Sequence, residues 1–365
     1  MSTNDLIELH LLENPMSDAA RAERMKDLGF GRVFTEHMVV AEYADGAWKR
    51  AVLQPYAPIT LEPAASVLHY GQAIFEGYKA YAQRDGGVCT FRADRNAARF
   101  NKSAARLAMP ALPEELFTAA GDALITQEQA WVPKEVGHSL YMRPLMISTE
   151  PALGVRPAKT YKFILFGSPS AAYFPRGVKP VNVWISEDYS RAAPGGTGFA
   201  KCAGNYAASL AAQAQALEKG CDQVVWTDAC THQLVEEMGG MNVFFVYQEG
   251  GKTVLVTPKL TGTLLPGVTR DSLMTLGQDL GYATEERTVS VEEWGKALAD
   301  GRMLEAFACG TAAVITPIGS VRSKHGEWNV HGGEPGAVAT RMREALLDIQ
   351  HGRAEDKHGW LHRVC

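Results

Sequence analysis

The sequence has no long apolar run, no surplus of basic residues and no paired cysteine motif. No stretch approaches the roughly 18 consecutive apolar residues of a membrane-spanning helix, so we expect no membrane span. With 36 Lys and Arg against 41 Asp and Glu, the formal net charge is −5, which excludes the broad basic surface of a nucleic-acid-binding protein. The six cysteines show neither a CxxC pair nor zinc-ligand spacing. We therefore expect free thiols, a cytoplasmic location and no metal site.

Apolar residues are abundant, at 46% of the 365 residues. This content with a modest net charge indicates a folded globular chain, and at roughly 150 residues per domain the length favours two domains. Proline and glycine are dense between Gly167 and Pro180, which predicts a surface connector and a domain boundary. The predicted division is a small N-terminal α/β domain at 1–170, an interdomain loop at 171–180 and a large C-terminal domain at 181–365.

Helices and strands are predicted in both halves, so we expect an α/β (α+β) fold. The glycines of Arg84–Gly87 predict a hairpin turn between strands 78–82 and 88–91. Asp94 is expected to cap a helix that ends near Ala108. The other expected helices are 17–27, 113–131, the segment after Lys201 as far as 219, 268–280 and 337–350, and the other expected strands are 140–148, 161–166, 181–185, 224–227, 242–247, 253–256 and 302–308.

Lys201 lies in the segment richest in glycine, PGGTGFAKCAGNY at 194–206. A lysine in a glycine-rich loop between a strand and a helix can be held close to the backbone, partly desolvated and nucleophilic. A solvated loop lysine is the competing interpretation, and the loop alone favours it. The third glycine of a dinucleotide-binding fingerprint is missing from this loop, which weakens a nucleotide-binding interpretation.

Two turns have the composition of anion sites, Gly267–Thr269 at a predicted helix start and Gly310–Ala312 after a predicted strand. Unpaired backbone N–H groups at a helix start, together with a threonine hydroxyl, suit a phosphate group. Ordinary helix capping explains each turn equally well. Two such turns with a fixed arginine would have the composition of a phosphate pocket.

Seven segments, in the same order along the chain, resemble the branched-chain amino acid aminotransferases, a family of pyridoxal-phosphate enzymes of fold type IV. These segments are FTEHM at 34–38, HYGQAIFEGYKAY at 69–81, YMRP at 141–144, the lysine loop at 196–206, VEEMGGMN at 235–242, 265–270 and 305–313. The resemblance reverses the preference for a solvated Lys201. It implies two domains with the cofactor in the cleft between them, and a homodimer that completes each pocket.

The resemblance implies that pyridoxal 5′-phosphate forms a Schiff base with Lys201, which then shuttles a proton between the substrate Cα and the cofactor C4′. Glu237 matches the carboxylate that keeps the pyridine nitrogen protonated, so that the ring acts as an electron sink. Glu236 is the competing assignment, and the resemblance favours Glu237, because the spacing from Glu237 to Met241 and Asn242 fits the family pattern. The remaining cofactor residues implied by the match are Tyr206 at O3′ and, around the phosphate, Arg99, Val268, Thr269 and Thr311.

The function implied is transamination of L-leucine, L-isoleucine and L-valine with 2-oxoglutarate, giving branched-chain 2-oxo acids and L-glutamate by a ping-pong mechanism. Arg143 can hold the distal carboxylate of glutamate in a pocket that also takes a branched side chain. Phe30 and Val155 have a competing interpretation as ordinary core residues. The substrate residues implied by the match are Phe30, Tyr70, Tyr141, Arg143, Val155, Gly240 and Ala312.

Three alternatives stay open at this point. A D-amino acid transaminase and an aminodeoxychorismate lyase share the fold type, although the chain length and the Tyr141-x-Arg143 motif favour the branched-chain family. A non-catalytic nucleotide-binding module is the alternative from a different class. It would bind nucleotide tightly and carry no coloured cofactor.

Overall fold

The computed structural model describes residues 6–171 and 179–365, which form two compact units. Unit 1 contains residues 6–171, Ala200–Gly204 and Asp348–Cys365, and unit 2 contains residues 179–199 and Asn205–Leu347. The predicted division differs, because it assigns the lysine segment and the C-terminus to the C-terminal domain. Most of the predicted interdomain loop, 171–180, lies outside the described residues. None of the helices in the described ranges is long and apolar enough to cross a membrane.

The sheet of unit 1 has ten strands in its described part, in the order β1-β4-β2-β9-β8-β6-β7-β19, with β3 paired to β2 and β5 paired to β8. Its strands are β1 (Ile7–Leu9), β2 (His37–Ala44), β3 (Ala47–Trp48), β4 (Ala51–Pro55), β5 (Ala73–Phe75), β6 (Tyr78–Ala82), β7 (Val88–Phe91), β8 (Ser139–Ser148), β9 (Tyr161–Ser170) and β19 (Leu361–Arg363). The predicted hairpin is confirmed as β6 and β7, which pair antiparallel.

The predicted connector begins too early, because β9 continues through Ser170 and pairs with β8 over its whole length. Gly167 allows this continuation. A Cβ at Gly167 would lie 2.9 Å from Cγ2 of Thr35, and the Thr35 and Gly167 backbones are hydrogen bonded. The glycine therefore permits a close approach of two chain segments, although in the sequence it resembles the start of a loop.

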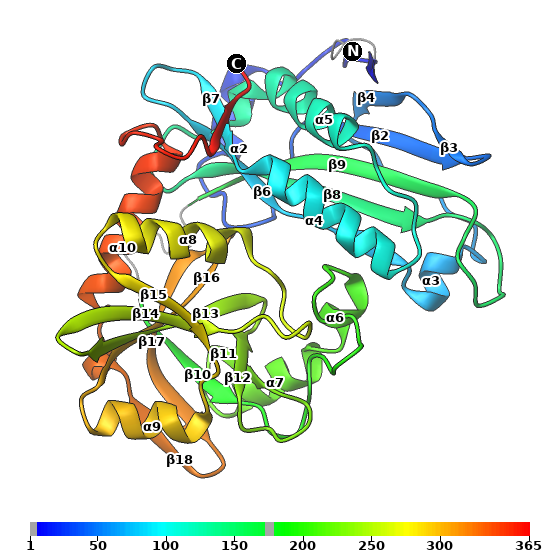
Figure 1. Cartoon of the computed structure of the whole chain (residues 1–365). Coiled ribbons are helices and arrows are strands. Elements are labelled where there is room, and N and C mark those ends of the chain that lie inside the picture. The colour runs from blue at the N-terminus through cyan, green and yellow to red at the C-terminus, as the bar shows by residue number, and fades with distance from the viewer. Residues whose placement is uncertain (1–5, 172–178) are drawn as a thin grey trace. The chain divides into compact units, whose positions relative to one another are not determined.

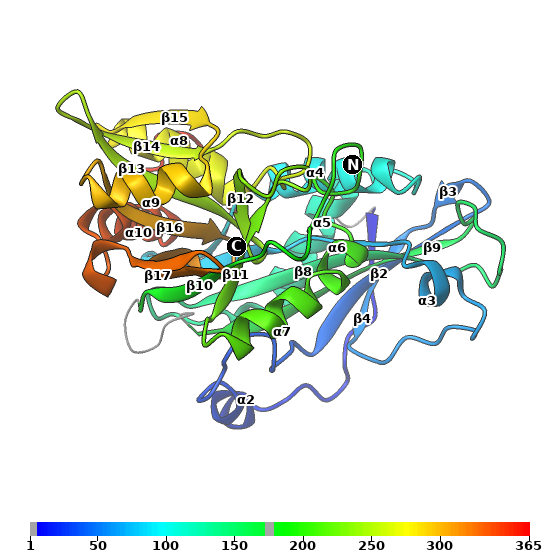
Figure 2. The same cartoon turned by 90° about the horizontal axis from the view of Figure 1, so that it is seen from below.

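Two long helices, α4 (Ala93–Arg106) and α5 (Glu114–Gln127), cover one face of this sheet in both views (Figures 1 and 2). Phe100 of α4 and Phe117 of α5 pack on Phe163 of β9. The prediction that Asp94 caps α4 is wrong, because the helix begins at Ala93 and Arg92 is the N-cap, without a side-chain cap. The helices of unit 1 are α2 (Asp18–Arg24), α3 (Ser66–Tyr70), α4 (Ala93–Arg106), α5 (Glu114–Gln127) and the 3-10 helix η1 (Gln129–Trp131).

The sheet of unit 2 has nine strands in the described ranges, in the order β12-β11-β10-β17-β16-β13-β14-β15, with β18 paired to β17. Its strands are β10 (Val181–Ile185), β11 (Gln223–Thr227), β12 (Val235–Met238), β13 (Met241–Glu249), β14 (Lys252–Pro258), β15 (Ala283–Arg287), β16 (Met303–Gly310), β17 (Val314–Ser323) and β18 (Gly326–Asn329). β12 also pairs with β13, so six strands form a closed circuit of hydrogen-bonded pairs.

Helices lie on both faces of the unit 2 sheet, with α8 (Val268–Asp279) and α9 (Val291–Ala299) on opposite sides (Figure 1). Trp294 of α9 packs against Phe245, and α7 packs on Trp184 and Trp226. The single helix predicted after Lys201 is two helices, α6 and α7. The remaining helical elements are α6 (Ala203–Ala207), α7 (Leu210–Glu218), α8 (Val268–Asp279), α9 (Val291–Ala299), α10 (Ala337–Gln350) and the 3-10 helix η2 (His331–Gly333).

Candidate active site

Lys201 is held by its backbone against α4 and β5 of unit 1. Its N–H donates to Ser103 Oγ at 2.9 Å, and its carbonyl accepts from the Phe75 N–H at 3.0 Å. The Lys201 Nζ lies 4.8 Å from the centroid of the Phe75 ring, and the residue is half-buried. A cation over an aromatic face is stabilised by the ring quadrupole. The structure therefore shows a positioned lysine and not a freely solvated one.

The loop that carries Lys201 is closed at its base by two residues of unit 2. Thr197 Oγ1 donates to Asn205 Oδ1 at 2.6 Å, and Asn205 Nδ2 donates to the Thr197 carbonyl at 2.8 Å. These reciprocal bonds join the residue four positions before Lys201 to the residue four positions after it. They restrict the loop without occupying the lysine side chain.

Arg99 is buried in α4 and pairs with the fully buried Glu76. Its Nε and Nη2 donate to the two carboxylate oxygens at 2.7 and 2.9 Å, and Asn96 Nδ2 and the Gly77 N–H donate to the same carboxylate. Burial by itself would raise the pKa of Glu76. The charge and hydrogen bonds of Arg99, the charge of Lys201 and the Asn96 bond together hold that pKa below its ordinary value of 4.5.

Glu76→Gln is expected to destabilise unit 1 by about 3 kcal/mol, because it removes the buried negative charge that neutralises Arg99. Urea unfolding followed by tryptophan fluorescence measures the change. Glu292→Gln is the matched control, since Glu292 pairs with Lys296 on an exposed helix face, and its midpoint should not move. A Glu76→Gln protein as stable as the wild type would contradict this account of the pair.

The same pair predicts how stability depends on pH. The pKa of Glu76 is lower in the folded protein than its ordinary 4.5, so its contribution is fully present above that value and is lost as the pH falls below it. The difference in stability between wild type and Glu76→Gln should therefore shrink as the pH is lowered from neutral to below 4.5.

Three of the predicted substrate residues form one cluster in unit 1. The Phe30 and Tyr141 rings meet edge to face with centroids 5.0 Å apart, and Arg143 Nη2 donates to the Tyr141 hydroxyl at 3.2 Å. The Arg143 guanidinium also lies 5.0 Å from the Phe75 ring, so that ring has contacts with both Lys201 and Arg143. Phe30 is 41% exposed, which excludes the interpretation of it as a core residue.

Tyr70 and Val155 are placed differently from this cluster. Tyr70 is exposed and its hydroxyl donates to the Leu153 carbonyl, while Val155 is 84% exposed. Val155 is therefore not a core residue. Within the described ranges, neither side chain makes a hydrogen bond or a ring contact with Phe30, Tyr141 or Arg143.

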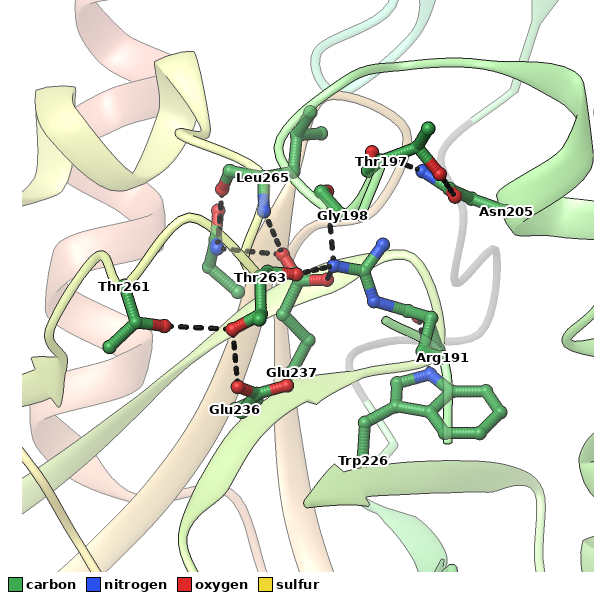
Figure 3. Close-up of polar contacts among 12 residues, drawn as sticks. Arg191, Thr197, Gly198, Asn205, Trp226, Glu236, Glu237, Thr261, Thr263 and Leu265 are labelled. Carbon is green, nitrogen blue, oxygen red and sulfur yellow. Dashed lines mark hydrogen bonds and ion pairs between the residues drawn. The ribbon is translucent and has the colours of Figure 1, made fainter. Parts of the chain in front are cut away.

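Glu237, the predicted partner of the pyridine nitrogen, is a buried residue of β12 in unit 2. Its Oε1 accepts from the Leu265 N–H at 2.8 Å and from Asn242 Nδ2 at 3.2 Å, and its Oε2 lies 2.7 Å from Arg191 Nη2 (Figure 3). The neighbouring Glu236 accepts one hydrogen bond, from the Thr263 hydroxyl. Burial is the largest influence on Glu236 and raises its pKa.

Three of the other predicted residues of unit 2, Gly240, Thr311 and Ala312, lie in turns at one end of its sheet, while Tyr206 lies in α6 and Val268 and Thr269 begin α8. Asn242 pairs with Cys309, so the β12–β13 turn with Gly240 and the β16–β17 turn with Thr311 and Ala312 emerge at the same end. Asn242 Nδ2 also donates to the Leu265 carbonyl, which ties in the loop before Val268 and Thr269 of α8. A Cβ on Gly240 would lie 3.5 Å from the Tyr206 ring.

The sequence interpretation missed several residues that surround Lys201 and Glu237. Phe75 and Glu76 lie in the segment HYGQAIFEGYKAY at 69–81. A carboxylate among mostly apolar residues there could have indicated a buried ion pair. Arg191 and Asn242 had no such local signal, because their roles depend on Glu237, which is 46 and five residues away in the chain.

Known proteins resemble this chain over most of its length. The family model described as amino-transferase class IV matches residues 73–321. A protein of Streptomyces coelicolor named "Probable branched-chain-amino-acid aminotransferase" is 55% identical over 365 residues, with 100% of both chains covered. Its counterpart in Mycolicibacterium smegmatis, named "Branched-chain-amino-acid aminotransferase", is 54% identical over 353 residues, with 96% of both chains covered.

Solved structures of the same family share the fold. The branched-chain amino acid aminotransferase of Escherichia coli superposes with a TM-score of 0.75 at 27% identity, covering 91% of this chain and 100% of that one. The branched-chain aminotransferase of Thermoproteus uzoniensis, solved with norvaline, gives a TM-score of 0.72 at 25% identity, covering 90% and 100%. The chain therefore belongs to the class IV aminotransferases of fold type IV and, within them, to the branched-chain-amino-acid aminotransferase family.

Proposed function

We propose that the protein transfers the amino group of L-leucine, L-isoleucine or L-valine to 2-oxoglutarate with pyridoxal 5′-phosphate as cofactor. The products are the branched-chain 2-oxo acid and L-glutamate. The observation that carries the proposal is the placement of Lys201 on the Phe75 ring, beside the buried Glu76–Arg99 pair, in a chain of this family. Such a placement suits an amine that must react repeatedly at one fixed position.

The residues present fit this cofactor. Its phosphate requires a cation and several N–H donors. In unit 1 Arg99 offers a cation, and in unit 2 the first turn of the 12-residue helix α8, which has no side-chain cap, offers N–H donors. Val268, Thr269 and Thr311 belong to the segments that would hold the phosphate, Tyr206 would hold O3′, and Lys201 would hold the cofactor covalently. The bound group supplies an electron sink for negative charge at the substrate Cα.

The chain's own residues would do the acid–base work. In one half-reaction Lys201 Nζ would take a proton from the substrate Cα, and in the other half-reaction it would return a proton to that atom. The Phe75 ring would keep the amine in place. Glu237 would supply the negative charge opposite the pyridine nitrogen. The backbone of Gly240 and Ala312 would receive the substrate α-carboxylate.

Arg143 offers a reason why one pocket can accept both a branched side chain and glutamate. Its Nε is buried and has no hydrogen-bond partner within the described residues. A buried donor without an acceptor is costly, and a ligand carboxylate would satisfy it. The Phe30 and Tyr141 rings would form apolar walls beside it for the branched side chains.

We further propose a cytoplasmic homodimer. Tyr70 and Val155 are implied substrate residues, yet they are exposed and have no recorded polar or ring contact with the Phe30, Tyr141 and Arg143 cluster in the described chain. A second subunit would account for both facts if each subunit lends these side chains to its partner. Light scattering of the holoenzyme should give the mass of a dimer, and a monomeric active enzyme would contradict this assembly.

The function is tested with purified holoenzyme and 2-oxoglutarate, measuring L-glutamate formed from each amino donor. Leucine, isoleucine and valine should all support turnover, whereas D-alanine should not. Aminodeoxychorismate, offered alone, should not be converted, because that substrate belongs to the lyase alternative. Turnover with D-alanine or aminodeoxychorismate and none with leucine would assign the chain to one of those two activities instead.

A further inference from the structure

Arg191 lies at the junction of three segments of unit 2 (Figure 3). Its Nη2 is 2.7 Å from Glu237 Oε2, donates to the Gly198 carbonyl in the lysine loop at 3.2 Å, and donates to the Thr263 carbonyl in the loop before α8. The exposed fractions of the Arg191 and Glu237 side chains are 8% and 3%. One guanidinium thus contacts the carboxylate and two loops.

Little room exists for this junction to rearrange. A Cβ at Gly198 would lie 2.2 Å from the Thr263 carbonyl oxygen, so the two loops that accept from Arg191 are in direct backbone contact. On the other side of Glu237, Asn242 and the Leu265 N–H hold Oε1. The direction of the Glu237 carboxylate is therefore set from both sides.

The adjacent residue Glu236 provides a natural comparison. It is buried on the same strand and faces Thr263 instead of Arg191 (Figure 3). Its Oε2 has no hydrogen-bond partner in the described part of the chain, and burial raises its pKa. A buried carboxylate with one neutral donor thus tends toward its protonated form, whereas one that is paired with a guanidinium keeps its charge.

We propose that Arg191 is the positioning residue that keeps the Glu237 carboxylate ionised and directed at the pyridine nitrogen of the cofactor. This inference rests on the proposed function. It adds a role for a residue that contacts Glu237 and need not contact cofactor or substrate. The negative charge of Glu237 at the pyridine nitrogen would then depend on Arg191, a residue 46 positions earlier in the chain.

Other titratable groups face Glu237 from the neighbouring elements. Cys309 on β16 has a raised pKa because it is buried, so its thiol stays neutral at physiological pH. The charge of Arg270 in α8 lowers the pKa of Cys309, which partly offsets the effect of burial, and Arg270 forms an ion pair with Glu286. Burial raises the pKa of Glu236, on the same strand, and the Thr263 hydrogen bond and the charge of Arg191 oppose this rise. These groups leave Arg191 as the cation whose removal should change the charge of Glu237 most.

The test is the pH dependence of Arg191→Gln holoenzyme. Without the guanidinium, burial should raise the pKa of Glu237, so that the carboxylate becomes protonated on the acid side and ionised again as the pH rises. Relative to wild type, kcat for leucine should fall about tenfold or more at pH 6, with a smaller deficit at pH 9. The Kd for pyridoxal 5′-phosphate, measured by fluorescence quenching, should rise most at pH 6.

Two further variants separate charge from structure. Glu236→Gln, on the same strand, should leave both pH profiles unchanged. Arg191→Gln added to Glu237→Gln should cause no further loss, because the two side chains act through one interaction. A deficit of Arg191→Gln that is equal at all pH values, or no deficit, would overturn the proposal.

If Arg191→Gln is recovered unfolded, Arg191→Lys replaces it. A lysine retains the charge but lacks the planar fork, so the wild-type shape of the pH profile should remain while the cofactor Kd rises. A wild-type Kd, or an acid-side loss in this charge-conserving variant, would overturn the proposal. Wild-type enzyme without leucine-dependent glutamate formation would instead overturn the proposed function.

Discussion

Lys201→Ala is expected to abolish transamination, lowering kcat by at least about 10³-fold. The variant loses the amine that would link to the cofactor and carry the proton at the substrate Cα. Its fold should be retained, because the loop is held by the Lys201 backbone bonds and by the Thr197–Asn205 pair, none of which uses the lysine side chain. Glutamate formation, cofactor colour and the thermal unfolding midpoint are the measurements.

Lys201→Arg is the matched variant for the electrostatic part of this expectation. It keeps a positive charge beside Glu76 and Phe75 but offers no primary amine, so it should be folded and as inactive as the alanine variant. Borohydride reduction of the wild-type holoenzyme, followed by peptide mass analysis, should place the cofactor on Lys201. Residual activity above a tenth of wild type in either variant, or a cofactor adduct on another lysine, would contradict the assignment.

Glu237→Gln is the second large effect, with an expected loss of about 10²-fold in kcat. Glutamine can still accept from the Leu265 N–H but carries no negative charge, so the pyridine nitrogen would lose the group that keeps it protonated. The cofactor Kd should rise as well. Steady-state kinetics with leucine and a fluorescence titration with pyridoxal 5′-phosphate measure the two effects.

Glu236→Gln is the control for this substitution, since it alters the adjacent buried carboxylate of the same strand. In the described part of the chain Glu236 accepts one hydrogen bond, from Thr263, and burial raises its pKa, so glutamine should be tolerated with activity close to wild type. Reversed results, with Glu236→Gln inactive and Glu237→Gln active, would move the pyridine partner to the competing residue.

Local signals predicted the parts of the fold that depend on local chemistry. Helix α10 has the predicted bounds, Ala337–Gln350, and the strands on both sides of Arg84–Gly87 pair as expected. The start of α4 was missed because Arg92 adopts a left-handed conformation, which is uncommon for arginine. Strand β12 was missed because its carboxylates Glu236 and Glu237 are buried, which breaks the usual alternation of apolar and polar residues.

Site residues that belong to a sequence motif could be predicted, whereas contacts between two segments distant in the sequence could not. Lys201, Arg99 and Glu237 could be named from the resemblance to the family. The buried pairs Glu76–Arg99 and Arg191–Glu237 could not, because each joins segments 23 or 46 residues apart and periodicity describes only neighbours. The assignment of Ala200–Gly204, with Lys201, to unit 1, although the chain before and after that segment belongs to unit 2, was equally invisible in the sequence.

The proposed amino-group transfer is tested most directly by running the first half-reaction in isolation. Holoenzyme is mixed with L-leucine without any 2-oxo acid, and both the cofactor absorbance and the branched 2-oxo acid released are measured. We expect one equivalent of 2-oxo acid per site, a complete spectral change, and its reversal by 2-oxoglutarate with release of glutamate. A cofactor spectrum that leucine does not change, with no 2-oxo acid released, would contradict it.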